Sequence, residues 1–157
     1  MILEMDIDGI IVKLYIHGYE PNADDNSIYP WCKCGFMFQS GDWLNYHSTN
    51  AEILLSSEID VLEHALNKLL SDEPSQIKKV RFVEPDFTFM LPPKYNLLNN
   101  PNIIFRCEGD TIQDVYAEWR ITFWQPNGLT ANYLTLTLGR SEITQLRNYL
   151  SSITNNV

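Results

Sequence analysis

Cys32 and Cys34, separated by one residue, have the side chains of this sequence best suited to binding a metal ion. Zinc in proteins takes three or four ligands, so these thiolates would need His47 and Cys107 to complete a site. The spacing also has a simpler interpretation. Alternate residues of a strand share a face, which would bury both thiols with the two phenylalanines that follow at the same spacing. We expect core cysteines, no metal and no cofactor.

Glu84 and Asp86, on either side of Pro85, are the second candidate for chemistry. Two carboxylates on one face of a strand could serve as an acid and a base. Proline cannot donate a hydrogen bond to a sheet, so the segment is expected at a sheet edge or a bulge, where charges also prevent unwanted strand pairing. We favour this structural role. A small enzyme or metal-binding protein that uses Cys32, Cys34, His47 or Glu84 is the alternative.

Several well-known catalytic motifs are absent from the sequence. It contains no His-Glu-x-x-His, no Gly-x-Ser-x-Gly, no phosphate-binding Walker loop and no Gly-x-Gly-x-x-Gly. The glycines are dispersed, as turn and strand-end glycines are. We therefore expect a protein that is not an enzyme.

The charge of the chain is acidic and unevenly distributed. Twenty Asp and Glu residues against eleven Lys and Arg residues give a formal net charge of -9. Residues 1–76 hold thirteen acids and three bases, whereas residues 77–157 hold seven acids and eight bases. This balance argues against binding to nucleic acids or to anionic membranes, both of which require cations on the protein. A cationic protein partner stays open.

The pattern of apolar residues predicts the elements that must position these side chains. Strict alternation predicts strands over 2–8 and 10–17, joined at Asp8-Gly9, and over 31–39 and 43–48. Further strands are expected over 80–83, 87–91 and within 114–138. Leucine and isoleucine stripes predict helices near 57–71 and 141–153, with Ser57, together with Asp60, and Ser141 as their caps.

The strands come in hairpins and the helices stand singly, which predicts an α+β fold with an antiparallel β-sheet and two amphipathic helices. No linker separates domains, so residues 1–157 are expected to form a single domain. The two helices carry similar apolar patterns, which leaves an internal duplication of a strands-then-helix unit open. The N-terminus lacks the basic and continuously apolar segments of a signal peptide, and we expect a cytoplasmic protein.

Acidic loop and turn residues with neighbouring aromatics are the candidate partner-binding residues. Loops on a rigid scaffold often carry binding specificity, and Trp and Tyr are favoured at protein interfaces. The candidates are Glu20, Asp24, Asp25, Asp42, Trp43 and Tyr46.

The segment 80–89, which contains Glu84-Pro85-Asp86, resembles the central signature of the WapI-type immunity proteins of bacterial polymorphic and contact-dependent toxin systems. The order of elements is also similar, with a leucine-striped helix before the signature and a strand pair and helix after it. The upstream strand with Trp43-Leu44-x-Tyr46 fits as well.

The resemblance implies a cytoplasmic protein without catalytic groups that binds and neutralises a cognate toxin domain by direct contact. Many such toxins are nucleases with cationic clefts, towards which an acidic inhibitor is steered. A regulatory interaction protein with no toxin partner is a further alternative.

Overall fold

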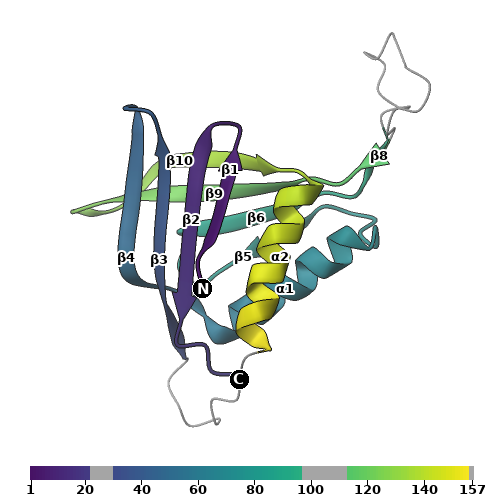
Figure 1. The fold of residues 1–157 in the computed structure, drawn as a ribbon, viewed down its shortest axis with the longest axis horizontal. Coiled ribbons are helices and arrows are strands. Elements are labelled where there is room, and N and C mark those ends of the chain that lie inside the picture. Colours follow the sequence, from purple (N-terminus) through teal and green to yellow (C-terminus); the bar gives the residue numbers. More distant parts are fainter. Residues whose placement is uncertain (22–29, 97–112, 156–157) are drawn as a thin grey trace.

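The computed structural model describes residues 1–21, 30–96 and 113–155 (Figure 1). Within these residues, the chain forms two four-stranded antiparallel sheets, one two-stranded sheet and two helices. The first sheet, in the order β1-β2-β3-β4, contains β1 (Leu3–Ile7), β2 (Ile10–His17), β3 (Trp31–Ser40) and β4 (Leu44–Leu55). The second, in the order β10-β9-β6-β5, contains β5 (Lys78–Arg81), β6 (Phe87–Leu91), β9 (Ala117–Gln125) and β10 (Gly128–Leu138). The short sheet pairs β7 (Tyr95–Asn96) with β8 (Gln113–Asp114).

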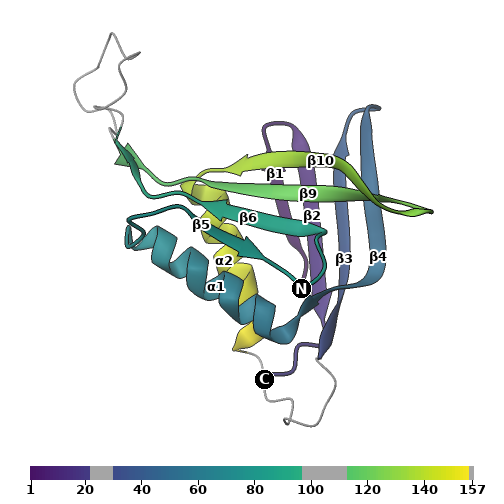
Figure 2. The same cartoon turned by 180° about the vertical axis from the view of Figure 1, so that it is seen from behind.

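The expected antiparallel α+β fold is confirmed, with the strands divided between two four-stranded sheets and not collected in one. Figures 1 and 2 show the strands of the second sheet running across those of the first. The periodicity of a strand predicts which face is apolar, but it does not say which other face covers it. The division into two sheets therefore could not be read from the alternation of residues.

The β1–β2 hairpin forms where Asp8-Gly9 predicts it. Both residues have positive φ, 50° and 84°, as a two-residue hairpin turn requires. The Asp6 carboxylate accepts a hydrogen bond from the Gly9 N–H at 2.8 Å, which supports the turn. The pairing of Leu3 with Leu14 and of Met5 with Val12 puts four buried side chains on one face.

The second sheet places Pro85 in the connection between β6 and β5, which is an edge strand, so the proline lies next to a sheet edge but outside any strand. β6 lies between β5 and β9. The Thr122 N–H donates to the main-chain oxygen of Asp86 at 2.8 Å, and this bond extends the β6–β9 pairing back to the carboxylate pair.

The helices α1 (Ser56–Leu70) and α2 (Arg140–Thr154) begin one residue before the predicted serine caps. Ser57 and Ser141 lie inside the first turn, so the prediction that they cap the helices is wrong. In each helix, a glutamate of the first turn instead accepts a hydrogen bond from the N-cap N–H. Glu58 accepts from the Leu55 N–H at 2.8 Å, and Glu142 accepts from the Gly139 N–H at 3.0 Å. Each is the glutamate half of a capping box.

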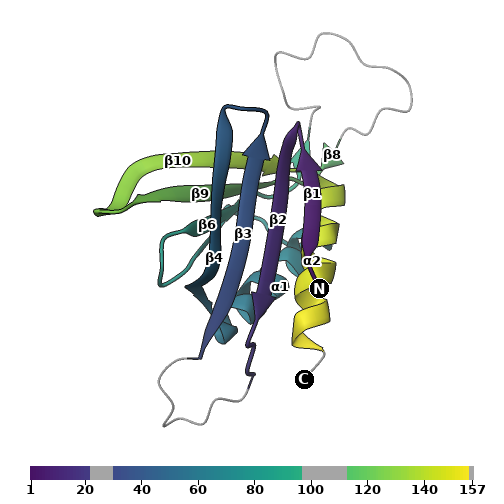
Figure 3. The same cartoon turned by 60° about the vertical axis from the view of Figure 1, so that its left-hand side comes forward.

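Each half of the chain is a four-stranded meander followed by a fifteen-residue helix. Each helix also bonds to the first hairpin of the other half. The second Glu58 oxygen accepts from the Val83 N–H at 2.6 Å, and the Tyr149 hydroxyl accepts from the Ile16 N–H at 2.8 Å. Figure 3 shows α2 lying beside β1 at the edge of the first sheet. Neither helix in the described ranges is long and apolar enough to cross a membrane.

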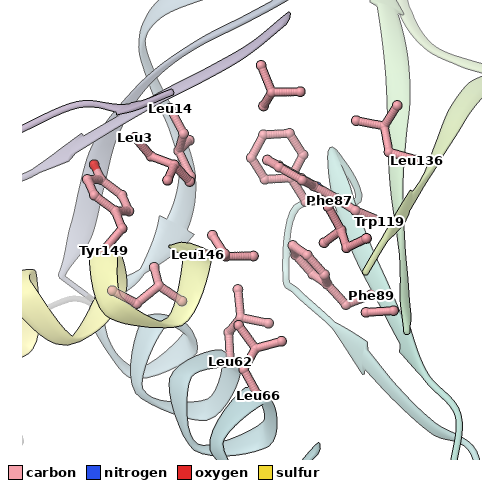
Figure 4. Close-up of a cluster of buried hydrophobic side chains, with 14 of the residues drawn as sticks. Leu3, Leu14, Leu62, Leu66, Phe87, Phe89, Trp119, Leu136, Leu146 and Tyr149 are labelled. Atoms are coloured by element: carbon pink, nitrogen blue, oxygen red, sulfur yellow. The ribbon is translucent and has the colours of Figure 1, made fainter. Parts of the chain in front are cut away.

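One cluster of buried side chains joins both sheets and both helices (Figure 4). Its centre is aromatic. Trp119 of β9 is fully buried, with ring centroids 5.4 Å from Phe38, 5.2 Å from Phe87 and 5.3 Å from Phe89. Cys32 and Cys34 lie on the same buried face as Phe36 and Phe38, which confirms the expectation of core cysteines.

We propose that the chain unfolds as one cooperative unit, because each helix packs between elements of both halves. Replacing Leu62 or Leu146 with Ala should lower the free energy of unfolding by about 2–5 kcal/mol, since both side chains are buried. Urea denaturation followed by circular dichroism measures the loss. Val61→Ala is the matched control on α1, since Val61 is 51% exposed, and should change stability by less than about 0.5 kcal/mol. Two separate unfolding transitions would contradict the single unit.

Candidate functional site

A cleft of about 280 Å³ opens where β3, β4, β9 and the β5–β6 connection meet. Its wall combines two kinds of side chain, carboxylates and aromatic rings. We call it the carboxylate cleft. Its principal lining residues are Glu52, Glu84, Asp86, Phe36, Tyr46 and Trp124.

The aromatic wall of the cleft continues the aromatic core. The centroid of the Phe36 ring lies 5.4 Å from that of Phe87 in the core and 5.5 Å from that of Tyr46 in the cleft. Tyr46 in turn makes an edge contact with Phe123 at 4.9 Å, and its hydroxyl accepts from the main-chain N–H of Trp124 at 3.3 Å. This chain of ring contacts holds the wall in place.

Asp86 is the buried carboxylate of the cleft, with 5% of its surface exposed. Burial and, to a smaller extent, the negative charge of Glu84 raise its pKa from 3.8 to about 6. Hydrogen bonds to the carboxylate from its own main-chain N–H and from the Trp124 indole oppose this effect without cancelling it. The hydrogen bonds orient the Asp86 carboxylate, but its ionised form is less favourable in the cleft than it is in water.

The charges of the cleft are not neutralised within the described part of the chain. The ion pairs among the described residues lie outside the cleft. Lys13 pairs with Glu4 at 2.9 Å, and Asp72 pairs with Lys94 at 3.0 Å and with Arg140 at 3.7 Å. Aromatic faces and unpaired carboxylates both attract positive groups. The cleft is chemically suited to a cation.

The structure separates the predicted partner-binding residues. Glu20 follows β2, where its main-chain N–H donates to the Ser56 hydroxyl at 3.0 Å. Asp42 and Trp43 lie in the turn after β3, at the other end of that ten-residue strand. A strand of this length spans about 33 Å, so the two ends do not form one surface. Tyr46 lies in the cleft.

Asp24 and Asp25 lie outside the described residues, as does Cys107. The turn that carries Asp42 sits beside the Asp8-Gly9 turn, because the Ser40 hydroxyl donates to the Gly9 carbonyl at 2.8 Å. Trp43 is 69% exposed there. An acidic surface with an exposed indole therefore forms at this end of the first sheet.

The alternative set for an enzyme or a metal site is not brought together. Burial raises the pKa of the Cys34 thiol to about 12 and also raises that of Cys32, whereas a reactive thiol needs a lowered pKa. His47 pairs with Met37 and lies on the outer face of the first sheet, while Glu84 is in the cleft. Across the described ranges, no three His, Cys, Asp or Glu side chains are grouped to hold a metal ion.

A second hollow, of about 430 Å³, lies on the outer face of the first sheet. Gly35 supplies no side chain to this face, and Tyr15, Met37 and His47 stand around the gap. Its lining is apolar and lacks the converging polar groups that fix a ligand's orientation. The carboxylate cleft is the stronger candidate site.

Sequence reasoning recognised Tyr46, Glu84 and Asp86 separately but did not bring them together. It missed Glu52, because β4 continues to Leu55, seven residues beyond the predicted end of that strand. A bulge in the pairing of β4 with β3 accompanies Asn50, which has φ of 57°. The interrupted alternation around this residue hid the continuation of the strand.

Comparison with known protein families gives a match over the full sequence. The family model described as the immunity protein WapI-like family matches residues 1–157, the whole chain. No curated protein matches it.

The raised pKa of Asp86 predicts how stability depends on pH. Because the folded pKa lies above the unfolded one, ionisation costs folding free energy as pH rises from about 4 to about 6, and the loss persists above that. Asp86→Asn should therefore be more stable than the wild type at pH 7.5, by up to about 3 kcal/mol. The difference should shrink towards pH 4. Urea denaturation of both proteins across this range measures it, and a difference independent of pH would refute the prediction.

Proposed function

The chain belongs to the WapI-like immunity protein family, and we propose that it acts in the cytoplasm by binding and neutralising a cognate bacterial toxin domain, a nuclease, through direct contact. The observation that carries this proposal is the family match across all 157 residues. The proposed toxin is a protein with a cationic surface.

The distribution of charge supports a cationic partner. The formal net charge is -9, and residues 1–76 hold all of the excess of acids. A nuclease binds phosphates through Lys and Arg, so its substrate cleft is positively charged. An acidic protein is drawn to such a cleft and can occupy it in place of the nucleic acid.

The arrangement of the site supports binding over catalysis. The carboxylate cleft has a rigid aromatic wall and unneutralised charge, and the buried thiols have raised pKa values. The exposed Trp43 offers an apolar contact of the kind enriched at protein interfaces. The cleft and the exposed indole favour recognition of another protein, and the raised pKa values of the thiols argue against thiol catalysis.

The proposal is tested by capture followed by inhibition. The tagged full-length protein is used to isolate its partner from the cells that produce it, and the partner is identified by mass. The purified partner is then assayed for cleavage of RNA and DNA with increasing amounts of the protein. We expect cleavage to stop at a one-to-one ratio. Undiminished cleavage at a tenfold excess would refute direct neutralisation.

Electrostatic steering gives a second test, because two groups of acids can be changed separately. One group is Glu20, Asp24 and Asp25, which follow β2 in the sequence, and the other is Asp42, in the turn after β3. We propose that the group facing the partner contributes to association, so that reversing it to Lys slows association about tenfold at low salt. The loss should shrink as salt screens the charges.

Stopped-flow or biosensor association rates at low and high salt measure this effect. Glu73→Lys, in the turn after α1, is the control for a single charge reversal elsewhere on the surface. If both variants associate like the wild type at every salt concentration, neither group of acids steers the complex.

A further inference from the structure

Glu52, Glu84 and Asp86 bring three formal negative charges to one cleft, and no basic side chain among the described residues lines it. The Arg120 guanidinium on β9 lies 4.1 Å from the centroid of the Tyr133 ring, and Arg120 pairs through its strand with Thr88 and Thr135. Arg120 follows the inward-facing Trp119 and therefore projects from the opposite face of the sheet. The free protein thus leaves the cleft without a counter-charge among the described residues.

The free protein maintains this cleft at a cost. Buried carboxylates are normally paired with a cation, because removing an unpaired charge from water is unfavourable. Asp86 is 95% buried but has only neutral hydrogen-bond donors. A cation entering the cleft would provide the missing pairing, and so the cleft is better adapted to the bound state than to the free state.

The spacing of the carboxylates indicates the size of that cation. They surround the cleft but are not grouped closely enough to hold a metal ion within the described ranges. A volume of about 280 Å³ also exceeds the needs of a bare ion, since one water molecule occupies about 30 Å³ in the liquid. The geometry favours an organic cation that reaches several carboxylates at once.

The aromatic wall distinguishes between the two organic cations that proteins carry. The guanidinium group of arginine is planar, stacks on aromatic rings, is weakly hydrated and donates hydrogen bonds in a fork that matches carboxylates. The ammonium group of lysine is a compact and strongly hydrated point charge. The rings of Phe36, Tyr46 and Trp124 beside Glu84 and Asp86 offer both the stacking surface and the acceptors.

We propose that the carboxylate cleft receives the side chain of an arginine from the toxin, with its guanidinium between Glu84 and Asp86 and against the rings of Tyr46 and Trp124. This assignment rests on the proposed function and specifies its contact. It places the centre of the interface at the junction of the two sheets.

The direct test compares the affinities of three variants for the captured toxin. Glu84→Gln and Asp86→Asn each remove one charge of the cleft with little change in shape. We expect each to weaken binding by about 30-fold or more, chiefly through faster dissociation. Glu73→Gln removes the same charge from the turn after α1 and should stay within about twofold of the wild type. Circular dichroism and urea denaturation check that each variant folds, and Glu84, only partly buried, is the safer of the two cleft positions.

The outcomes separate this proposal from the proposed function. If the wild type neutralises the toxin but the folded cleft variants bind as tightly as Glu73→Gln, the cleft assignment is wrong and the function stands. If the wild type fails to neutralise its captured partner, the proposed function itself is wrong.

A second test needs no toxin. N-acetyl-arginine amide and its uncharged analogue N-acetyl-citrulline amide are titrated separately into the protein, and the NMR signal of the Trp124 indole N–H is followed. We expect a saturable shift with the arginine compound alone, and its loss in Glu84→Gln. Equal responses to the two compounds would overturn the assignment of a guanidinium group.

Discussion

The packing of Trp119 between the two sheets is the contact on which the rest of the structure depends. Its indole is fully buried and touches Phe38 from the first sheet and Phe87 and Phe89 from the second. Aromatic rings bury large areas and gain further from edge-to-face contacts, which makes them effective at joining sheets whose strands cross. The indole N–H finds no acceptor within the described residues, so this packing comes with a polar group left unsatisfied.

The carboxylate cleft depends on the same packing. Phe36 contacts Phe87 at the edge of the core and Tyr46 in the cleft, so the cleft begins where the core meets solvent. Asp86 directly precedes Phe87 in sequence, and its main-chain oxygen is held by Thr122. The position of the buried carboxylate therefore follows from the pairing of β6 with β9. A rigid core thus presents an unfavourable charge at a fixed place, as preorganised binding sites do.

Local patterns predicted the elements better than their assembly. Period-two alternation located β2 to the residue, because its buried apolar side chains alternate with more exposed and mostly more polar ones. The predicted helix caps were wrong, since a serine just before an apolar stripe resembles a cap whether or not the helix has already begun. The two halves share the order of a meander followed by a helix, as the duplication left open in the sequence would require. No sequence pattern indicates that Glu58 and Tyr149 each bond to the other half. The cleft joins Tyr46, Asp86 and Trp124 across the two sheets, and only the three-dimensional packing brings such distant residues together.

Asp86 has no cation beside it among the described residues of the free protein, and the proposed contact with the toxin supplies one. Carbon-13 NMR of the Asp86 carboxyl group, titrated free and in the complex, tests it most directly. The free protein should show a pKa of about 6, and the complex should lower that pKa to its ordinary value or below, because a nearby cation favours the ionised form. An unchanged or raised pKa in the complex would contradict the account.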